Sequence, residues 1–181
     1  MAEVIFLQDE LIILRALEVN DVPQWASWFN DTVVTEYMNK GMFPVAEADQ
    51  SNRLNTLYNQ QTNNIQLAIV VKQSQVLVGL IGLHKIDWVH RHGDISILIG
   101  NEVGRGKGFS KHAVRLVVEH AFNKLNLHKL TSGMWSNNLA SEACFKSLGF
   151  KYEGCRKAQY FYQGSYVDEL NYGLLRKEWL R

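Results

Sequence analysis

Apolar residues along the chain follow two patterns, one with a period near two residues and one with a period of three to four. Short stretches that alternate, or that are apolar throughout and bounded by turn residues, predict β-strands. They cover residues 4–7, 11–15, 67–72, 76–86, 94–99 and 129–135, and segment 150–179 contains two more around a turn at Gly164. Short polar or glycine-containing turns separate the strands between residues 67 and 99, which favours an antiparallel meander.

Between Ser110 and Lys124 the apolar positions recur at steps of three and four residues, as in an amphipathic helix that packs on a sheet. A first helix is expected after Asp21, because a capping aspartate followed by a proline suits the unpaired N–H groups of a first turn. Helices are also expected over 46–60 and 139–148. Strands and helices mixed in this order indicate an α+β fold.

Composition narrows the class of protein further. With 181 residues, of which 46% are hydrophobic, the chain fits a single domain over residues 1–181. A net charge of +1 gives no basic field, so we expect no nucleic-acid partner. No apolar run approaches the roughly 20 residues of a membrane span, and the N-terminus lacks a signal pattern, so we expect no membrane association and a cytoplasmic location. Cys144 and Cys155 lack CxxC spacing and are expected to be free thiols.

The most informative segment is 105–110, Arg-Gly-Lys-Gly-Phe-Ser, which lies between a strand ending at Ile99 and the helix near Ser110. Amide groups at such a glycine-rich helix start bind phosphate, because they point outward at the positive end of the helix dipole. The spacing excludes a Walker A loop and a dinucleotide fingerprint, since Gly108 and Phe109 stand where those motifs need other residues. The alternative is a turn that only connects strand and helix.

What remains is the pattern Arg/Gln-x-x-Gly-x-Gly/Ala, with Ser110 as a small residue at the last position. It resembles the GNAT family of acetyl-coenzyme A dependent N-acetyltransferases. Asn138, Ser141 and the Leu-Gly-Phe of 148–150 are similar to the RimJ/RimL-like branch of that family, as is the tail. The resemblance covers nearly the whole chain. It implies the GNAT fold, a single mixed and largely antiparallel splayed sheet flanked by helices, with acetyl-CoA as co-substrate and no metal.

The resemblance also implies how the coenzyme is held. The strand before the glycine loop and the strand after the next helix diverge, and the pantetheine arm enters between them. Main-chain groups of Ile97, Leu98 and Ile99 would bond the pantetheine amides, and the Asn138 side chain would contact the arm from the other side. The backbone amides of one run would hold the pyrophosphate: Arg105, Gly106, Lys107, Gly108, Phe109 and Ser110. A diphosphate needs several converging donors, and an arm with two amides needs an unpaired strand edge.

Acetyl transfer to an amine needs a base for the amine and a proton for the leaving thiolate. Asp94 stands where this branch commonly has a glutamate base, and its shorter side chain favours a bridging water. The alternative for Asp94 is a turn cap or a pair with Arg91. The tyrosine that often serves as acid is replaced by Phe145, which leaves Ser141 as the expected acid, with Cys144 or water as substitutes. The alternative for Ser141 is a helix N-cap.

Four further residues are expected to contact the acceptor, because they lie in regions that border the acceptor cleft in the family: Trp28, Asn30, Tyr37 and His84. His84 is a candidate base, with a satisfied, partly buried histidine as its alternative. A loose similarity over residues 28–44 favours a small-molecule amine, such as a nucleotide-linked amino sugar. The alternatives are a protein N-terminus of the ribosomal type, a polyamine, and a non-catalytic acyl-CoA sensor. We expect a monomer or a homodimer.

Overall fold

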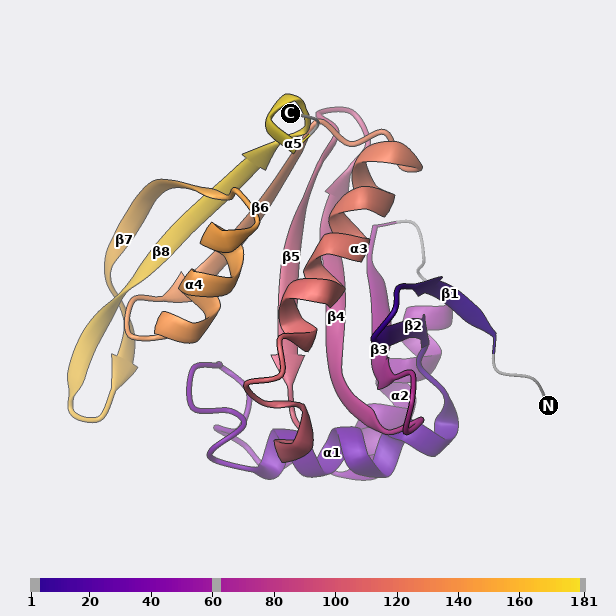
Figure 1. Ribbon diagram of the computed structural model, residues 1–181. Coiled ribbons are helices and arrows are strands. Elements are labelled where there is room, and N and C mark those ends of the chain that lie inside the picture. The colour runs from indigo at the N-terminus through magenta and orange to yellow at the C-terminus, as the bar shows by residue number, and fades with distance from the viewer. Residues whose placement is uncertain (1–3, 60–62, 180–181) are drawn as a thin grey trace.

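The computed structural model describes residues 4–59 and 63–179, and in them eight strands form one sheet in the order β1-β2-β3-β4-β5-β6-β8-β7 (Figure 1). Neighbouring strands are antiparallel except β5 and β6, which are parallel. The strands are β1 (Ile5–Gln8), β2 (Ile12–Ala16), β3 (Ile65–Val71), β4 (Leu77–Asp87), β5 (His92–Ile99), β6 (Lys129–Trp135), β7 (Lys151–Tyr162) and β8 (Ser165–Leu175). The predicted meander is β3-β4-β5, and the mixed α+β sheet is confirmed.

Helices cover both faces of this sheet. They are α1 (Val22–Asn30), α2 (Glu47–Asn59), α3 (Phe109–Asn123), α4 (Leu139–Ser147) and the short α5 (Arg176–Trp179). In Figure 1, α3 and α4 lie in front of the sheet, whereas α2 lies behind it. The prediction of a strand up to Trp179 was wrong at its end, because Glu178 accepts the Leu175 amide at 3.1 Å and the chain turns into α5. Among the described helices, none has the length and apolar character needed to cross a membrane.

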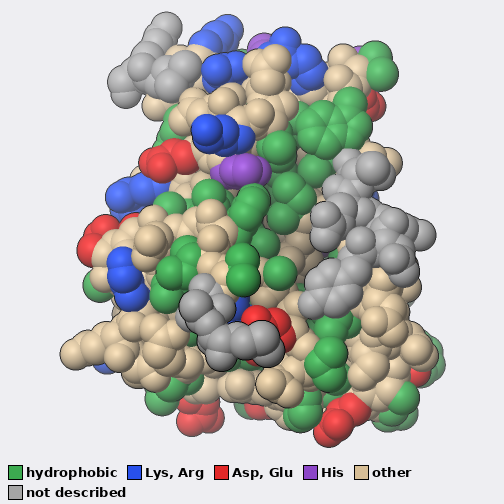
Figure 2. Space-filling model, turned by 90° about the vertical axis from the view of Figure 1, so that its right-hand side faces the viewer, with side chains coloured by type: hydrophobic (Ala, Val, Ile, Leu, Met, Phe, Trp, Pro, Cys, Tyr) green, Lys and Arg blue, Asp and Glu red, His purple; other side chains and the backbone are tan. Residues whose placement is uncertain are grey.

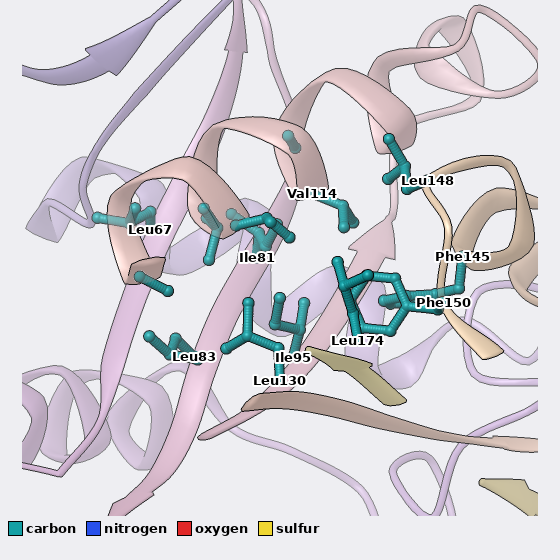
Figure 3. Close-up of a cluster of buried hydrophobic side chains, with 14 of the residues drawn as sticks. Leu67, Ile81, Leu83, Ile95, Val114, Leu130, Phe145, Leu148, Phe150 and Leu174 are labelled. Carbon is teal, nitrogen blue, oxygen red and sulfur yellow. The ribbon is translucent and has the colours of Figure 1, made fainter. Parts of the chain in front are cut away.

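The larger hydrophobic core lies between the sheet and helices α3 and α4 (Figure 3). Ile81, Leu83 and Ile95 point from β4 and β5 toward Val114 of α3, and the six apolar positions predicted to face the sheet from α3 are all buried. Since side chains alternate along a strand, the neighbours of these residues point to the opposite face. Asp94 therefore faces the side of α1 and α2.

A second core fills the space under α1 and α2, around Trp25 and Trp28. Asp21 is the cap residue of α1, as the sequence predicted, but its carboxylate makes no hydrogen bond to this helix and accepts the Glu18 amide at 2.8 Å. Arg15 donates to both of its oxygens instead, at 2.6 and 2.9 Å, and the pair is almost buried. The bidentate guanidinium satisfies both carboxylate oxygens, and this pairing replaces the expected cap.

The sheet opens in its middle, where the strands β5 and β6 diverge (Figure 1). Their pairing covers only 92–94 of β5 and 129–131 of β6. Beyond that point β5 continues against β4 up to Ile99, and β6 continues against β8 up to Trp135. The predicted splay is confirmed, and it leaves one edge of β5 without a strand partner from residue 95 onward.

Candidate active site

A loop with two glycines in left-handed conformation connects the open strand β5 to α3. Gly106 has φ +70° and Gly108, the residue before the first turn of α3, has φ +81°. Glycine adopts this conformation without the steric penalty that a Cβ brings. A Cβ built on either glycine would meet no atom within 4 Å, so the space beside both residues is open.

Backbone donors of this loop are largely unpaired. The N–H groups of Lys111 and His112 donate to the carbonyl oxygen of Gly108, at 2.9 and 3.3 Å. In the part of the chain that the structure describes, the amides of residues 106–110 have no protein acceptor. Amides at the start of a helix, next to open space, fit the oxygens of a diphosphate. Arg105 is a correction to the prediction, because its N–H already donates to Glu102 at 3.0 Å.

The open edge of β5 offers main-chain groups from alternate residues. A Cβ on Gly79 of β4 would lie 2.2 Å from the carbonyl oxygen of Leu98, so this carbonyl faces β4. Because main-chain groups alternate in direction along a strand, those of Ile97 and Ile99 face the gap. Two of the three residues expected to bond the pantetheine arm can therefore do so, and the prediction for Leu98 is corrected.

Across the gap, α4 begins where β6 ends. Asn138 is its cap, since its Oδ1 accepts the amide of Ser141 at 3.1 Å. The alternative role of Ser141 as the cap is therefore wrong. Among the described residues, neither the Asn138 Nδ2 nor the Ser141 hydroxyl has a protein partner. Phe145 is only 1% exposed and packs edge-on against Phe150, so the position of the usual tyrosine points into the core.

Asp94 lies at the point where β5 and β6 separate. Thr131 of β6 donates its hydroxyl to Asp94 at 3.0 Å. Burial raises the pKa of the Asp94 carboxyl above its ordinary value, and the nearby Glu169 carboxylate adds to this. The expected alternative, a pair with Arg91, is wrong, because the Arg91 guanidinium donates to Asn126 at 2.8 and 2.9 Å.

Two cavities lie on this face of the sheet. One, of about 320 Å³, is lined by Asp94, Thr131, Arg156 and Glu169 among others. The other, of about 300 Å³, lies against Trp135 and residues of β7. Tyr160 lines the second cavity and its hydrogen-bond partner Glu169 lines the first, so the two cavities are neighbours, and we call them together the cleft.

An aromatic cluster lies beside this cleft, and the sequence analysis had named only Tyr37 of it. Trp135 stacks on Tyr160 with ring centroids 4.8 Å apart, and Tyr37 stacks on Tyr162 at 5.9 Å. The Tyr160 hydroxyl donates to Glu169 at 3.0 Å. Burial and this bond raise the pKa of Tyr160 to about 12, so its phenol stays protonated. We call Trp135, Tyr160, Glu169 and Tyr37 the acceptor wall.

Two of the four residues expected to contact the acceptor have structural roles. Trp28 is 5% exposed and packs so closely on Gly100 that a Cβ there would lie 2.1 Å from its ring. Asn30 holds Val45 through two hydrogen bonds, of 2.7 and 2.9 Å. Neither residue is among those that line the two cavities in the described chain. The prediction for Trp28 and Asn30 is corrected accordingly.

His84 lies on β4 opposite Asp94. Its Nε2 is 2.9 Å from the hydroxyl of Ser96, and burial lowers its pKa, so the neutral ring is favoured. This geometry matches the satisfied, partly buried histidine that was the alternative to a base. Tyr37 stacks on Tyr162 beside the cleft but is not among the described residues that line its two cavities, and its contact with the acceptor stays a prediction.

Another cavity, of about 470 Å³, lies elsewhere. It opens at the β1 edge of the sheet, where Figure 2 shows hydrophobic side chains gathered on the surface. Phe6, Leu57, Ile65 and Leu125 line it, and β4 separates it from Asp94. No carboxylate is found among its described lining residues. The convergent polar groups that a reaction needs lie in the cleft beside Asp94.

One group of possible metal ligands occurs in the described residues, formed by Asp9, Glu10 and His112. The Asp9 carboxylate already accepts the amides of Leu11 and Ile12, and it lies 2.7 Å from Nδ1 of His112. These bonds fasten the β1–β2 turn to α3 and account for the group as a structural contact.

Comparison with known proteins agrees with this geometry. Residues 12–151 match the family described as the acetyltransferase (GNAT) domain. An uncharacterized N-acetyltransferase, p20, of Bacillus licheniformis is 27% identical over 96% of this chain and 97% of its own length. The spermidine N(1)-acetyltransferase of Vibrio cholerae is 28% identical over 93% and 95% of the two chains. A solved structure of a Vibrio cholerae spermidine N-acetyltransferase with CoA and spermine has a TM-score of 0.86 at 23% identity, covering 96% of this chain and 100% of that one.

A mixed sheet that opens between two parallel strands, next to an amide-lined loop at a helix start, defines a coenzyme A dependent acyltransferase. With its matched family domain, the chain belongs to the GNAT acetyltransferase family. It is an N-acetyltransferase whose acetyl donor is acetyl-CoA.

Proposed function

We propose that the protein transfers the acetyl group directly to a primary amine of a small molecule, with Asp94 as the base. The observation that carries this proposal is the place of Asp94. It lies on the strand whose free edge and following loop would hold the donor, and its side chain faces the cleft with the acceptor wall. Donor and acceptor would thus meet at the strand gap without a covalent enzyme intermediate.

The donor would be held mainly by backbone. The amides of residues 106–110 would bind the diphosphate, and the main chain of Ile97 and Ile99 would bond the pantetheine amides. The side-chain amide of Asn138 would contact the arm from the side of α4. Acetyl-CoA supplies an activated thioester, and this frame would fix its carbonyl beside Asp94.

Asp94 is suited to accept a proton from an ammonium group. Its raised pKa makes it a better base than an exposed aspartate. Thr131 fixes the orientation of the carboxylate at 3.0 Å. An aspartate reaches less far than a glutamate, so one water would relay the proton.

The proton for the leaving thiolate would come from Ser141 or from water. Ser141 lies in the first turn of α4, at the opening of the gap, and its hydroxyl is not engaged by described residues. Cys144 is a weaker candidate, because burial raises its pKa to about 11 and it packs on the core. Coenzyme A thiolate is a good leaving group, so this step needs little help.

The acceptor wall suits an amine in its cationic form. Trp135 and Tyr160 offer aromatic faces, and Glu169 and Asp94 offer carboxylates, which together attract an ammonium group. The relative named a spermidine acetyltransferase makes a polyamine the second candidate acceptor. A nucleotide-linked amino sugar gains no support from the relatives described above.

The Asn138 and Ser141 pattern supports the RimJ/RimL-like branch as a finer assignment.

The test is release of free coenzyme A thiol from acetyl-CoA with a panel of amines. The panel contains spermidine, an aminosugar nucleotide, small amines and a peptide with a free N-terminus. The proposal expects turnover with at least one small amine and none with the peptide. Binding of acetyl-CoA without thiol release on any amine would favour the sensor instead.

A monomer or homodimer, and a cytoplasmic location, stay predictions.

A further inference from the structure

One of the two cavities of the cleft has an uncharged lining. Its volume is about 300 Å³. The described residues that line it are Asn39, Met42, Trp135, Gln159, Tyr160 and Phe161. None of these side chains carries a charge near neutral pH, since the pKa of the Tyr160 phenol is raised to about 12. The neighbouring cavity is lined by charged groups, among them Asp94, Arg156 and Glu169. The cleft therefore has a charged part that contains the proposed base and an uncharged part, which we call the uncharged cavity.

Aromatic rings and a thioether form much of the uncharged cavity. Trp135 and Tyr160 lie nearly parallel, with ring centroids 4.8 Å apart and an angle of 18° between the ring planes. Met42 and Phe161 are large apolar side chains that are 64% and 61% exposed. Single exposed apolar residues are ordinary on a protein surface, but these two line the same cavity. Apolar and aromatic groups gathered around a hollow are typical of a site for a small molecule.

Two carboxamides complete the lining of the uncharged cavity. Asn39 and Gln159 are exposed, and their side-chain amides have no hydrogen-bond partner among the described residues. An amide N–H group can donate to the face of an aromatic ring or to a polar substituent on that ring. The carboxamides thus add specificity without adding charge.

The two parts of the cleft meet at Tyr160. This residue lines the uncharged cavity, and its hydroxyl donates at 3.0 Å to Glu169, which lines the charged part. A molecule whose amine faces Asp94 can therefore extend past Tyr160 into the uncharged cavity. A second ammonium group placed there would lose water without gaining a carboxylate from the described lining residues, which is unfavourable.

We propose that the acceptor is an arylalkylamine, with its aromatic ring in the uncharged cavity and its primary amine at Asp94. This inference rests on the proposed function and adds the chemical class of the substrate. A cavity of about 150 Å³ is enough to bind benzene, so one of about 300 Å³ holds one ring or two fused rings. Aromatic rings make favourable contacts with other rings and with the sulfur of methionine, and both are present here. A polyamine is disfavoured in this cavity.

The first test compares acceptors that share a primary amine and differ at the other end of the molecule. Phenylethylamine, cyclohexylethylamine, propylamine and spermidine are compared by thiol release from acetyl-CoA. Burial of the ring and its contacts with other rings predict kcat/KM about 10- to 100-fold higher for phenylethylamine than for propylamine. Cyclohexylethylamine is apolar but not flat, and its kcat/KM should be about three- to tenfold lower than that of phenylethylamine.

The outcomes separate this inference from the proposed function. Equal kcat/KM for phenylethylamine and propylamine, or a higher value for spermidine, would overturn the inference and leave the proposed function intact. No turnover of any amine would overturn the proposed function, and the inference with it.

Met42→Ser should reduce the preference for the ring. The kcat/KM for phenylethylamine should fall about two- to tenfold, while that for propylamine stays unchanged. Phe43→Ser is the matched control, because Phe43 is 80% exposed and is not among the described residues that line the cavity. Both acceptors are measured with each variant, so a smaller folded fraction does not alter their ratio. The same change of ratio in both variants would contradict the inference.

Gln159→Glu places a carboxylate in the uncharged cavity with almost no change in size. The ratio of kcat/KM for spermidine to that for phenylethylamine should rise about fivefold, because a second ammonium group then has a partner at an exposed site. Gln73→Glu adds the same charge in the turn between β3 and β4 and should leave the ratio unchanged. An unchanged ratio in Gln159→Glu would show that the acceptor does not extend into this cavity, and the inference would be wrong.

Discussion

The loop at residues 106–110, the proposed donor site that we call the donor loop, and the acceptor wall, the proposed acceptor site, are built in different ways. The loop at residues 106–110 and the edge of β5 offer main-chain groups from one continuous stretch of chain. The acceptor wall is made of side chains from the α1–α2 connection, β6, β7 and β8. A backbone site depends on conformation and tolerates many side chains, whereas a side-chain site changes with each substitution. This difference explains how one fold keeps its donor while acceptors vary.

Asp94→Asn should have the largest effect on activity, because it removes the proposed base on the acceptor side. Removing the base is expected to lower kcat/KM about 10²- to 10³-fold near neutral pH. The loss should be larger at low pH and smaller at high pH, where the amine loses its proton unaided. In the wild type, the acid limb of the rate profile should lie above the ordinary pKa of an aspartate, because burial raises that of Asp94. Asp168→Asn, at the β7–β8 surface, is the control, and an unchanged pH profile in Asp94→Asn would remove Asp94 as the base.

Gly108→Ala should weaken the binding of acetyl-CoA on the donor side. The new methyl group would stand in the open space beside the free amides, and the loss of one charge-assisted contact corresponds to about 10-fold weaker acetyl-CoA binding. Left-handed alanine also lowers the free energy of unfolding by about 1–2 kcal/mol. Gly164→Ala has the same left-handed strain, at φ +87°, and lies in the β7–β8 turn. Equal acetyl-CoA affinity in both variants would argue against the donor loop.

Tyr160→Phe should raise the KM for the acceptor, and this tests the role of the acceptor wall. The ring keeps its stack on Trp135, but the hydroxyl that donates to Glu169 at 3.0 Å is lost. A hydrogen bond worth about 1 kcal/mol predicts a KM for the acceptor raised about fivefold, with unchanged acetyl-CoA affinity. Tyr166→Phe, whose ring is exposed, is the matched control. A change in coenzyme affinity without a change in acceptor KM would contradict this role.

Ser141→Ala should have the smallest effect. If its hydroxyl gives a proton to a thiolate that already leaves easily, kcat falls by less than about tenfold. Steady-state kinetics at saturating acceptor measures this directly. No change would assign the proton to water, while a loss of about 10³-fold would show that Ser141 is indispensable.

The sequence predicted most of the fold, because the elements follow local patterns. The buried positions of α3, the meander β3-β4-β5 and the parting of the strands after residue 94 all agree with expectation. The missing cap hydrogen bond of Asp21 and the short helix at Arg176–Trp179 depended on side chains brought together by the fold. A motif with fixed spacing likewise located the glycine-rich loop before α3, since its residues are contiguous, and its role in holding the donor stays a prediction.

The acceptor wall was harder to predict, because its residues lie far apart in the sequence. Trp135, Tyr160 and Glu169 come from three strands, and only the pairing of β6, β8 and β7 brings them together. Aromatic residues at alternate positions of the predicted tail strand were the available signal. Trp28 was expected to contact the acceptor but packs in the core. The sequence alone does not tell whether an aromatic residue near a cleft packs in the core or contacts a ligand.

Titration of acetyl-CoA into the wild type and Asp94→Asn by calorimetry tests the central claim, that donor binding is built from backbone and is separate from the acceptor side. We predict the same affinity and the same heat for both proteins, although turnover differs by two to three orders of magnitude between them. Absence of heat with the folded wild type, or loss of acetyl-CoA binding in Asp94→Asn, would contradict it.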